Sequence, residues 1–372
     1  MKKIALYIAA LASVSACIYP YSPDISSEVN HTLVVEGEIL VGGTSTIKLS
    51  YLEPLGGSSN MTPAGRAWIE DENGKTYQSA NPSLMTNVIS VPTDDAVTGI
   101  KYRSVIEVDG QQYSSDWVEP LTPPVIENVH FSADEKDVYV LADINAGNSG
   151  SGYVGFTYEE DWEFHADFIP EAEIDPKTWE YNYMIAVFPP YWCYKHANAE
   201  GAVLVNYSTT DGTVIKDCVV KTFPRTNSRN HKKYYILVKA YNMSEEAFRY
   251  DNYIEELSSV GGNLFSPEPG QMEGNLHCDT DAKQKVLGMV RAAQMSSKRA
   301  SIRTEFLIEP EPNYRGLVIP RPDEYEHLYY VSNYRPAVTV TVGDEEGLGW
   351  GPERCIDCTK DGGTLEKPSF WE

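Results

Sequence analysis

The stretch LVVEGEILVGGTSTIKLSY, residues 33–51, decides the fold class of this chain. In its first half, apolar residues recur at Leu33, Val35 and Ile39, and in its second half the same spacing gives Ile47, Leu49 and Tyr51. Alternation with a period of two is typical of a strand with one buried face. Because Gly42 and Gly43 separate the two halves and fit a tight reversal, the stretch predicts a β-hairpin.

The next seventy residues continue the same pattern. Five more strand candidates lie at 66–70, 75–79, 87–91, 100–108 and 112–118. Turns are indicated by Glu72-Asn73-Gly74 and Asp109-Gly110, whose residues tolerate positive φ. Seven short strands with regular turns predict an immunoglobulin-like β-sandwich over residues 31–120, although no Cys-Trp-Cys spacing of an antibody domain is present.

A proline-rich segment, residues 120–124, marks the expected domain boundary. Beyond it, residues 124–372 predict a larger β-rich domain with strands at 138–144, 234–241, 285–294, 299–307 and 335–342. One principal helix is expected near 244–260. Ser244 can cap it, its first turn is acidic, and an apolar stripe with helical spacing follows at Tyr250, Tyr253, Ile254 and Leu257. The chain is thus predicted to be mostly β.

The first seventeen residues have the order of a bacterial lipoprotein signal. Lys2 and Lys3 precede an apolar run from Ile4 to Val14, and Ser15-Ala16 stand directly before Cys17. The run is too short to span a bilayer, so we expect residues 1–16 to be cleaved and Cys17 to be lipidated. Residues 17–30 then form a linker, and no Asp follows Cys17, which favours the outer membrane. An ordinary secretory signal with an incidental cysteine is the alternative.

Composition narrows the classes of partner. The formal net charge is −24 at pH 7, with 42% hydrophobic residues and 25 tyrosines. Nucleic acid binding rests on clustered Lys and Arg, so this acidic chain argues against it. The acidity could favour cationic ligands, or it could be an ordinary solvated surface.

Five cysteines follow Cys17, namely Cys193, Cys218, Cys278, Cys355 and Cys358. Outside the cytoplasm we expect one or two structural disulfides, with the tail joined to Cys193 and the pairing of Cys218 and Cys278 left open. The Cys355–Cys358 pair could instead be a redox motif or half of a zinc site. No thioredoxin-like context or second CxxC motif supports either alternative.

Motifs of known enzymes are missing from the sequence. It contains no HExxH, GxSxG, P-loop or GxGxxG signature, and its seven histidines show no metal-ligand spacing. We therefore expect no catalytic residue, no resident metal and no cofactor.

The richest candidate binding region is residues 153–194, which holds thirteen aromatic residues, including Trp162, Trp179, Tyr181 and Tyr183. Aromatic side chains supply rigid contact area for partners and flat ligands. Because residues 159–182 lack clean periodicity and contain two prolines, we expect a long binding loop there. The alternative is that most of these rings fill the core of the second domain.

Several spaced segments together resemble the DUF4249 family of Bacteroidota lipoproteins. They are residues 33–37 (LVVEG), 235–241 (YILVKAY), 244–250 (SEEAFRY), 262–265 (GNLF), 274–276 (GNL) and 355–371 (CIDCTKDGGTLEKPSFW). The family usually has a Cys-Trp pair where this chain has Trp192-Cys193-Tyr194. The resemblance implies no catalytic residues, because no activity is established for the family.

What the resemblance does imply is a surface-exposed outer-membrane lipoprotein that accompanies a TonB-dependent transporter. We therefore expect a non-catalytic accessory subunit that helps to capture a small-molecule or peptide ligand. An extracellular hydrolase, which would need paired carboxylates or a metal, and a structural or adhesive surface protein are the alternatives.

Overall fold

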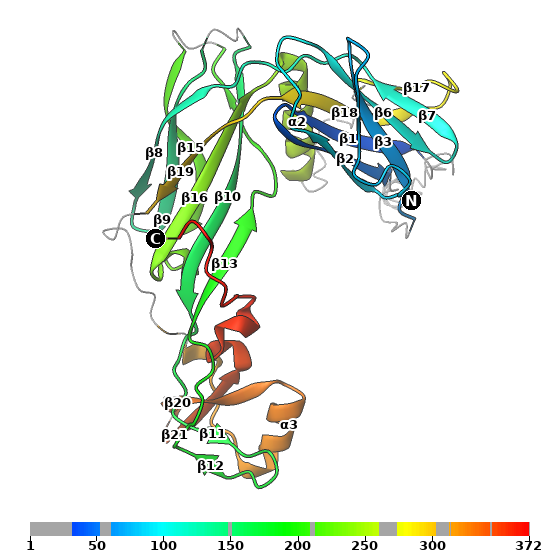
Figure 1. Cartoon of the computed structure of the whole chain (residues 1–372). Coiled ribbons are helices and arrows are strands. Elements are labelled where there is room, and N and C mark those ends of the chain that lie inside the picture. Colours follow the sequence, from blue (N-terminus) through cyan, green and yellow to red (C-terminus); the bar gives the residue numbers. More distant parts are fainter. Residues whose placement is uncertain are drawn as a thin grey trace, which may run out of the picture.

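The computed structural model describes residues 32–52, 61–147, 151–208, 213–259, 274–302, 312, 314–342 and 344–371. The expected signal peptide, Cys17 and the linker to residue 30 lie outside these ranges. Strands dominate the described residues, so the mostly β prediction is confirmed. Three lobes are visible in Figure 1: two β-sandwiches side by side and a smaller distal lobe below the second. None of the described helices has the length and apolar character needed to cross a membrane.

The first sandwich packs a four-stranded sheet, in the order β18-β1-β2-β5, against a five-stranded sheet, in the order β17-β7-β6-β3-β4. The four-stranded sheet consists of β1 (Leu33–Leu40), β2 (Gly43–Tyr51), β5 (Val88–Thr93) and β18 (Val286–Ala293). The other consists of β3 (Gly65–Asp71), β4 (Thr76–Gln78), β6 (Tyr102–Val108), β7 (Gln111–Ser115) and β17 (Leu276–Cys278). The predicted hairpin is present, and its alternating residues Val35, Ile39 and Ile47 are fully buried.

Two strands of this sandwich, β17 and β18, come from much later in the chain, after most of the second sandwich. β17 pairs with β7, and β18 runs parallel to β1 with Val35 opposite Gly288. The first domain predicted at 31–120 therefore lacks two strands that the structure places in it. Periodicity identified residues 285–294 as a strand, but it carries no information about which strand is the neighbour.

The second sandwich is built around long strands. One sheet has the order β13-β10-β16-β19 with β14 also paired to β10, and the other has the order β15-β9-β8. Their bounds are β8 (Val125–Ala133), β9 (Asp137–Asn145), β10 (Tyr153–His165), β13 (Trp192–Asn198), β14 (Val203–Asn206), β15 (Val214–Pro224), β16 (Lys233–Asn242) and β19 (Ser296–Ser301). The core between the sheets contains Val140, Phe156, Tyr234 and Ile236. Of the strand predicted at 299–307, residues 303–307 lie outside the described ranges.

The predicted helix is α2 (Glu245–Ser259), which begins where Ser244 Oγ accepts a hydrogen bond from the Ala247 amide at 3.1 Å. Its buried side meets β16 and β18 in a small cluster with Tyr241, Met243 and Met289. The helix therefore lies between the two sandwiches, as Figure 1 shows.

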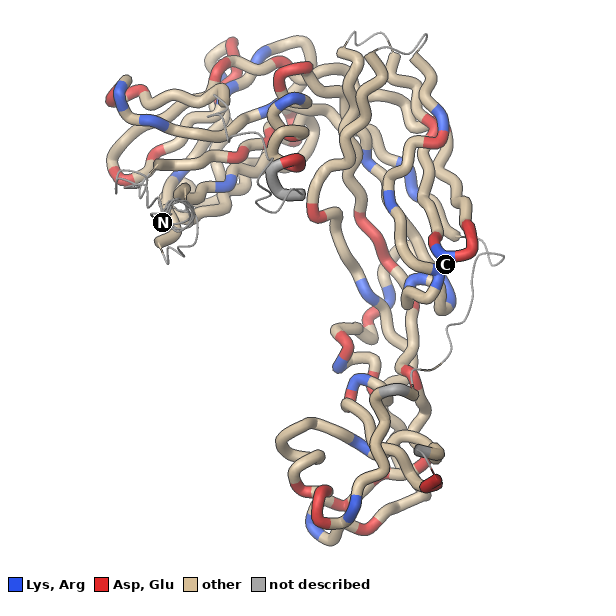
Figure 2. The backbone as a smooth tube through the Cα atoms, turned by 180° about the vertical axis from the view of Figure 1, so that it is seen from behind, with Lys and Arg blue, Asp and Glu red and all other residues tan. Residues whose placement is uncertain are grey.

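The distal lobe was not foreseen as a separate unit. It contains the hairpins β11 (Glu173–Ile174) with β12 (Tyr181–Asn182) and β20 (Tyr334–Val342) with β21 (Glu345–Pro352), the helix α3 (Tyr325–Tyr330), and the 3-10 turns η4 (Tyr314–Gly316), η5 (Pro322–Glu324), η6 (Glu353–Cys355) and η7 (Cys358–Asp361). Its own core is formed by Phe168, Leu317, Ala337, Cys355 and Ile356. Acidic and basic residues are spread over all three lobes, as Figure 2 shows.

Candidate functional site

An aromatic cluster connects α3, β21 and the β11-β12 hairpin of the distal lobe. Trp350 is fully buried, and its indole nitrogen donates a hydrogen bond to the Tyr181 hydroxyl at 3.1 Å. Tyr325 of α3 stacks on Trp350, with ring centroids 5.1 Å apart. Trp179 contacts Tyr325 as well as Tyr329 and Tyr330. Burial and the neighbouring Tyr325 raise the pKa of the Tyr181 hydroxyl, so this group stays protonated. Its oxygen accepts the hydrogen bond from Trp350 and thereby links β12 to β21.

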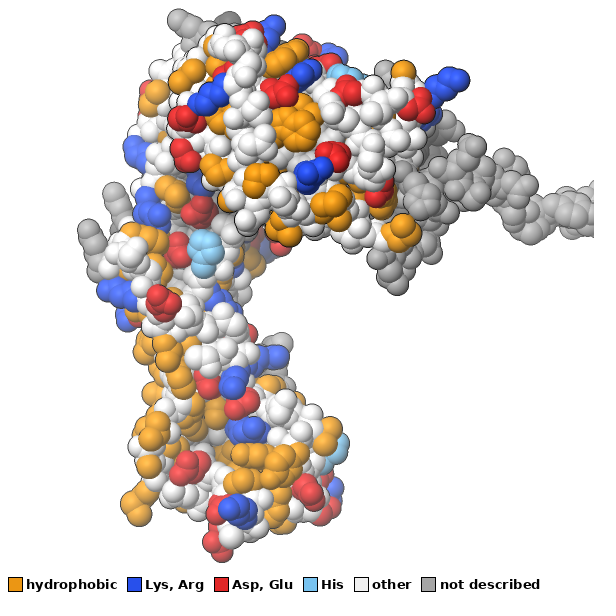
Figure 3. Space-filling model, turned by 45° about the vertical axis from the view of Figure 1, so that its right-hand side comes forward, with side chains coloured by type: hydrophobic (Ala, Val, Ile, Leu, Met, Phe, Trp, Pro, Cys, Tyr) orange, Lys and Arg blue, Asp and Glu red, His pale blue; other side chains and the backbone are white. Residues whose placement is uncertain are grey.

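The loop after β12 turns a continuous apolar surface outward. Its exposed residues, which we call the distal patch, are Tyr183 at 67%, Met184 at 86%, Val187 at 82% and Phe188 at 55% exposure. Figure 3 shows hydrophobic side chains gathered on the surface of this lobe. A group of large apolar side chains this exposed is costly in water and is typical of a contact surface.

A pocket of about 220 Å³ lies beside the distal patch. Ile174, Ile185, Val187 and Ile356 supply apolar walls, and Tyr329, Arg335 and Glu353 supply polar groups. The Arg335 guanidinium lies 3.9 Å from the Tyr329 ring centroid and donates a 3.0 Å hydrogen bond to the Tyr329 carbonyl. Because these contacts hold Arg335 in place, the pocket suits an apolar group that carries a polar end.

Of the four aromatic residues predicted to bind, Trp179, Tyr181 and Tyr183 belong to the distal lobe. Only Tyr183 among them is largely exposed. Trp179 and Tyr181 are half-buried, and their rings contact Tyr325 and Trp350 of the aromatic cluster. The exposed aliphatic residues Met184 and Val187 were not singled out in the sequence. The sequence feature that could have identified them is the uninterrupted apolar run at residues 183–188, shortly after Trp179 and Tyr181.

The expectation that Trp162 binds a partner or ligand is wrong, because its side chain is only 5% exposed. Its indole nitrogen donates to Ser228 Oγ at 3.2 Å, and the Arg229 guanidinium covers its ring at 4.1 Å. The expected binding loop at 159–182 is also wrong in its first part, since β10 extends to His165. Side chains on both faces of this part of β10 are buried, which removed the alternation that would have identified a strand.

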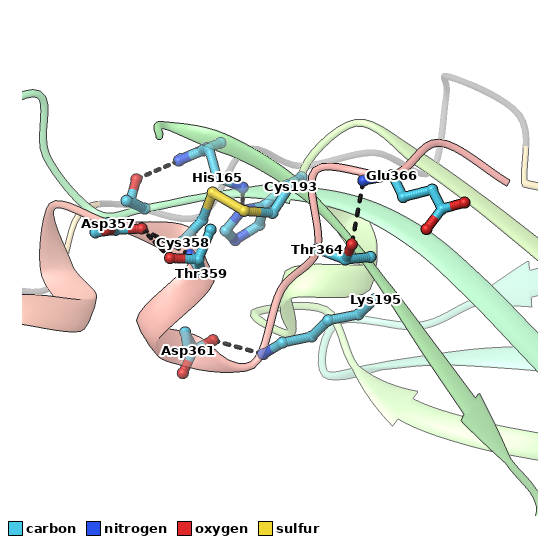
Figure 4. The surroundings of a disulfide bond; sticks show 11 residues. His165, Cys193, Lys195, Asp357, Cys358, Thr359, Asp361, Thr364 and Glu366 are labelled. Carbon is cyan, nitrogen blue, oxygen red and sulfur yellow. Dashed lines mark hydrogen bonds and ion pairs between the residues drawn. A yellow bond between two sulfur atoms is a disulfide. The ribbon is translucent and has the colours of Figure 1, made fainter. Parts of the chain in front are cut away.

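Among the described residues, two cysteines form one disulfide bond, and Cys218, Cys278 and Cys355 are buried free thiols. Cys193 is bonded to Cys358, with the two Cα atoms 5.8 Å apart, which confirms the expected link between the tail and Cys193. The bridge lies where β13 meets η7, as Figure 4 shows, and Lys195 pairs with Asp361 close by. Burial and Asp167 raise the pKa of the Cys355 thiol to about 12, so it lacks the thiolate that a redox CxxC motif requires.

Groups that could hold a metal ion lie away from the distal lobe. His130, Asp143 and Asp217 bring one imidazole and two carboxylates together on the second sandwich. Neighbouring strands juxtapose residues that are far apart in the sequence, so spacing along the chain did not reveal them.

Comparison with known proteins gives a family and no activity. No curated protein matches the chain. Among solved structures, trypsin-activated alpha-2-macroglobulin from Escherichia coli is 10% identical over 59% of this chain, with a TM-score of 0.19. The FN1-FN3 domains of chicken CNTN1 are 11% identical over 58% of this chain, with a TM-score of 0.16. The chain covers 15% and 62% of these two structures, and neither likeness bears on its function.

The family model described as "Domain of unknown function (DUF4249)" matches residues 18–299. This match covers well over half of the chain and includes the first sandwich, α2 and the second sandwich up to residue 299 in β19. The chain therefore belongs to the DUF4249 family.

Proposed function

We propose that this protein is an outer-membrane lipoprotein, anchored through Cys17, that acts as a non-catalytic accessory subunit of a TonB-dependent transporter. The distal patch is the contact surface in this proposal, and the adjacent pocket receives a group of the partner or of the captured ligand. The observation that carries it is the exposure of Met184 and Val187, at 86% and 82%, beside a pocket with a fixed arginine.

Three further points support the proposal. The lipoprotein signal in residues 1–17 would tether the chain outside the cytoplasm. Family membership agrees with the resemblance from which the transporter partner was inferred. The distal patch combines large apolar side chains with polar groups at its edge, which is the composition of protein interface centres.

The experiment is affinity purification of the tagged full chain from its native outer membrane in mild detergent, with mass spectrometry of co-purifying proteins and small molecules. Recovery of a TonB-dependent barrel at close to one copy per chain supports the proposal. Recovery of the chain alone refutes it and favours the hydrolase or the adhesive alternative.

A pair of variants connects the result to the distal patch. Val187→Ser with Phe188→Ser removes two exposed apolar side chains, and we expect partner recovery to fall at least about ten-fold, as for loss of an interface hot spot. The matched control is Leu84→Ser on the first sandwich, where the side chain is 58% exposed. If both variants recover the partner equally well, the distal patch is not the contact surface.

The anchor is tested separately. Cys17→Ser should release the chain from the membrane fraction and abolish the mass increase of an acylated N-terminus. Unchanged membrane retention of the Cys17→Ser variant would contradict lipid anchoring at this residue.

A further inference from the structure

Three potential metal ligands converge on the outer face of the sheet β15-β9-β8. His130 comes from β8, Asp143 from the central strand β9, and Asp217 from β15. One donor atom from each lies within 4.8 Å of the other two, and His130 Nε2 is 2.9 Å from Asp217 Oδ1. Nitrogen and oxygen donors of one tetrahedral zinc ion lie about 3.3–3.6 Å apart, so the side chains would have to close in by about 1 Å for all three to share an ion.

The backbone shows why these residues meet. Along β9 the buried positions alternate with outward ones, so Asp143 points outward between the buried Ala142 and Ile144. Both neighbouring strands lose their regular register beside this residue, β8 between Ile126 and Asn128 and β15 between Ile215 and Cys218. Such bulges redirect side chains, and they often accompany functional positions.

The bulge in β15 brings Asp217 to its partner. Asp217 has a positive φ of 55°, and its amide donates a 3.0 Å hydrogen bond to Asp143 Oδ1. Its carboxylate therefore stands beside that of Asp143 and remains largely open to solvent, with 69% of the side chain exposed. An ion bound here would keep free positions for water or for an incoming ligand.

Charge around the cluster is not balanced by basic side chains. Among the described residues, neither Asp143 nor Asp217 forms an ion pair with Lys or Arg, and His130 is the basic side chain that contacts Asp217. Two neighbouring carboxylates repel each other, and a bound cation would remove that repulsion. By contrast, the buried Glu160 of the same sandwich is paired with Arg229.

We propose that His130, Asp143 and Asp217 bind one divalent transition-metal ion of the zinc type. His130 Nε2 and one oxygen from each carboxylate would be the ligands, with water completing the shell. A mixed imidazole and carboxylate set suits zinc, whereas calcium and magnesium take oxygen ligands. Asn128 Nδ2 lies 3.4 Å from His130 Nδ1, so the reversed amide would accept the Nδ1–H and leave Nε2 free for the metal.

The test is a calorimetric titration of the full chain in mild detergent with Zn²⁺, after treatment with EDTA. We expect one strong site per chain, and at least about ten-fold weaker binding for His130→Ala and for Asp143→Asn, the least that loss of an outer-shell partner costs. Zinc should also raise the Tm of the wild type but not that of His130→Ala.

The chain supplies a matched control in His277. This residue also lies between two carboxylates, but Asp116 faces its Nδ1 at 3.9 Å and Asp279 faces its Nε2 at 3.4 Å. Asp116 and Asp279 face different nitrogens of the His277 ring, so an ion bound to one ring nitrogen could not reach both carboxylates. The His277→Ala variant should therefore bind zinc like the wild type.

Three results would overturn the proposal: no zinc binding by the wild type, wild-type affinity in His130→Ala, or an equal loss in His277→Ala. Circular dichroism melts check that each variant is folded. If His130→Ala does not fold, the exposed Asp217→Asn replaces it with the same expected loss. The site is independent of the distal patch, so either proposal can fail without the other.

Discussion

Loss of the Cys193–Cys358 bridge should weaken one part of the molecule and leave another unchanged. The bridge closes a segment of 165 residues, for which the chain-entropy relation gives a stabilisation of about 5 kcal/mol at 25 °C. Backbone contacts remain after reduction, including the Cys358 amide to the Pro190 carbonyl at 3.0 Å. We therefore expect a loss of about 3–5 kcal/mol, or a fall in Tm of about 10 °C.

The location of the bridge defines which transition moves. Cys193 is on β13 of the second sandwich and Cys358 is in η7 at the base of the distal lobe, whereas the first sandwich contains neither. Scanning calorimetry with and without a phosphine reductant should shift the transition of the second sandwich and the distal lobe alone.

Two controls make this expectation refutable. The double variant Cys193→Ser and Cys358→Ser should reproduce the effect of reduction, while Cys278→Ala in the first sandwich should not shift the same transition. If mass spectrometry proves full reduction and the transition stays within 2–3 °C, which is about 1 kcal/mol, the bridge does not stabilise this part of the fold.

Three other changes test the packing. Glu160→Gln should destabilise the second sandwich by about 3–5 kcal/mol in urea unfolding, because Glu160 is 1% exposed and its loss leaves the Arg229 charge without its partner. Burial, and to a lesser degree the neighbouring imidazole of His165, lowers the pKa of His231 from 6.5 to about 4. The neutral form of His231 therefore contributes its full stability above pH 6.5, and this stability is lost as the pH falls towards 4. His231→Asn should make the Tm less dependent on pH in that window, and an unchanged profile would contradict this. Gly288→Ala should cost the first sandwich about 2 kcal/mol or more in calorimetry, because its φ is +116° and a Cβ would lie 1.9 Å from the Val35 carbonyl oxygen; a wild-type transition would contradict it.

Local patterns in the sequence predicted local structure well. The alternation of Leu33, Val35 and Ile39 identified β1, and the capping serine with an acidic first turn identified the start of α2. Both depend on neighbours in the chain, where side-chain periodicity follows directly from backbone geometry. The link between the tail and Cys193 was expected as well, although the sequence left open which tail cysteine takes part.

Features that depend on long-range contacts could not be predicted in this way. The partner of β18 and the burial of Trp162 are set by segments that lie more than sixty residues away. For the same reason His130, Asp143 and Asp217 looked unrelated. Where both faces of a strand are covered, as at residues 160–165 of β10, the period-two signal disappears and the sequence resembles a loop.

The long strand β10 connects these observations. Its thirteen residues span about 40 Å, so one strand runs from the α2 side of the second sandwich to the disulfide beside the distal lobe. At its far end Phe164 is opposite Cys193, and the chain passes directly into the segment that leads to the distal patch. Glu160 and Trp162 are buried along the same part of the strand, where Arg229 contacts both. Of the four residues that sequence reasoning assigned to binding, Trp162 is therefore buried in β10 and Trp179 and Tyr181 are half-buried, whereas the exposed distal patch begins at the fourth, Tyr183.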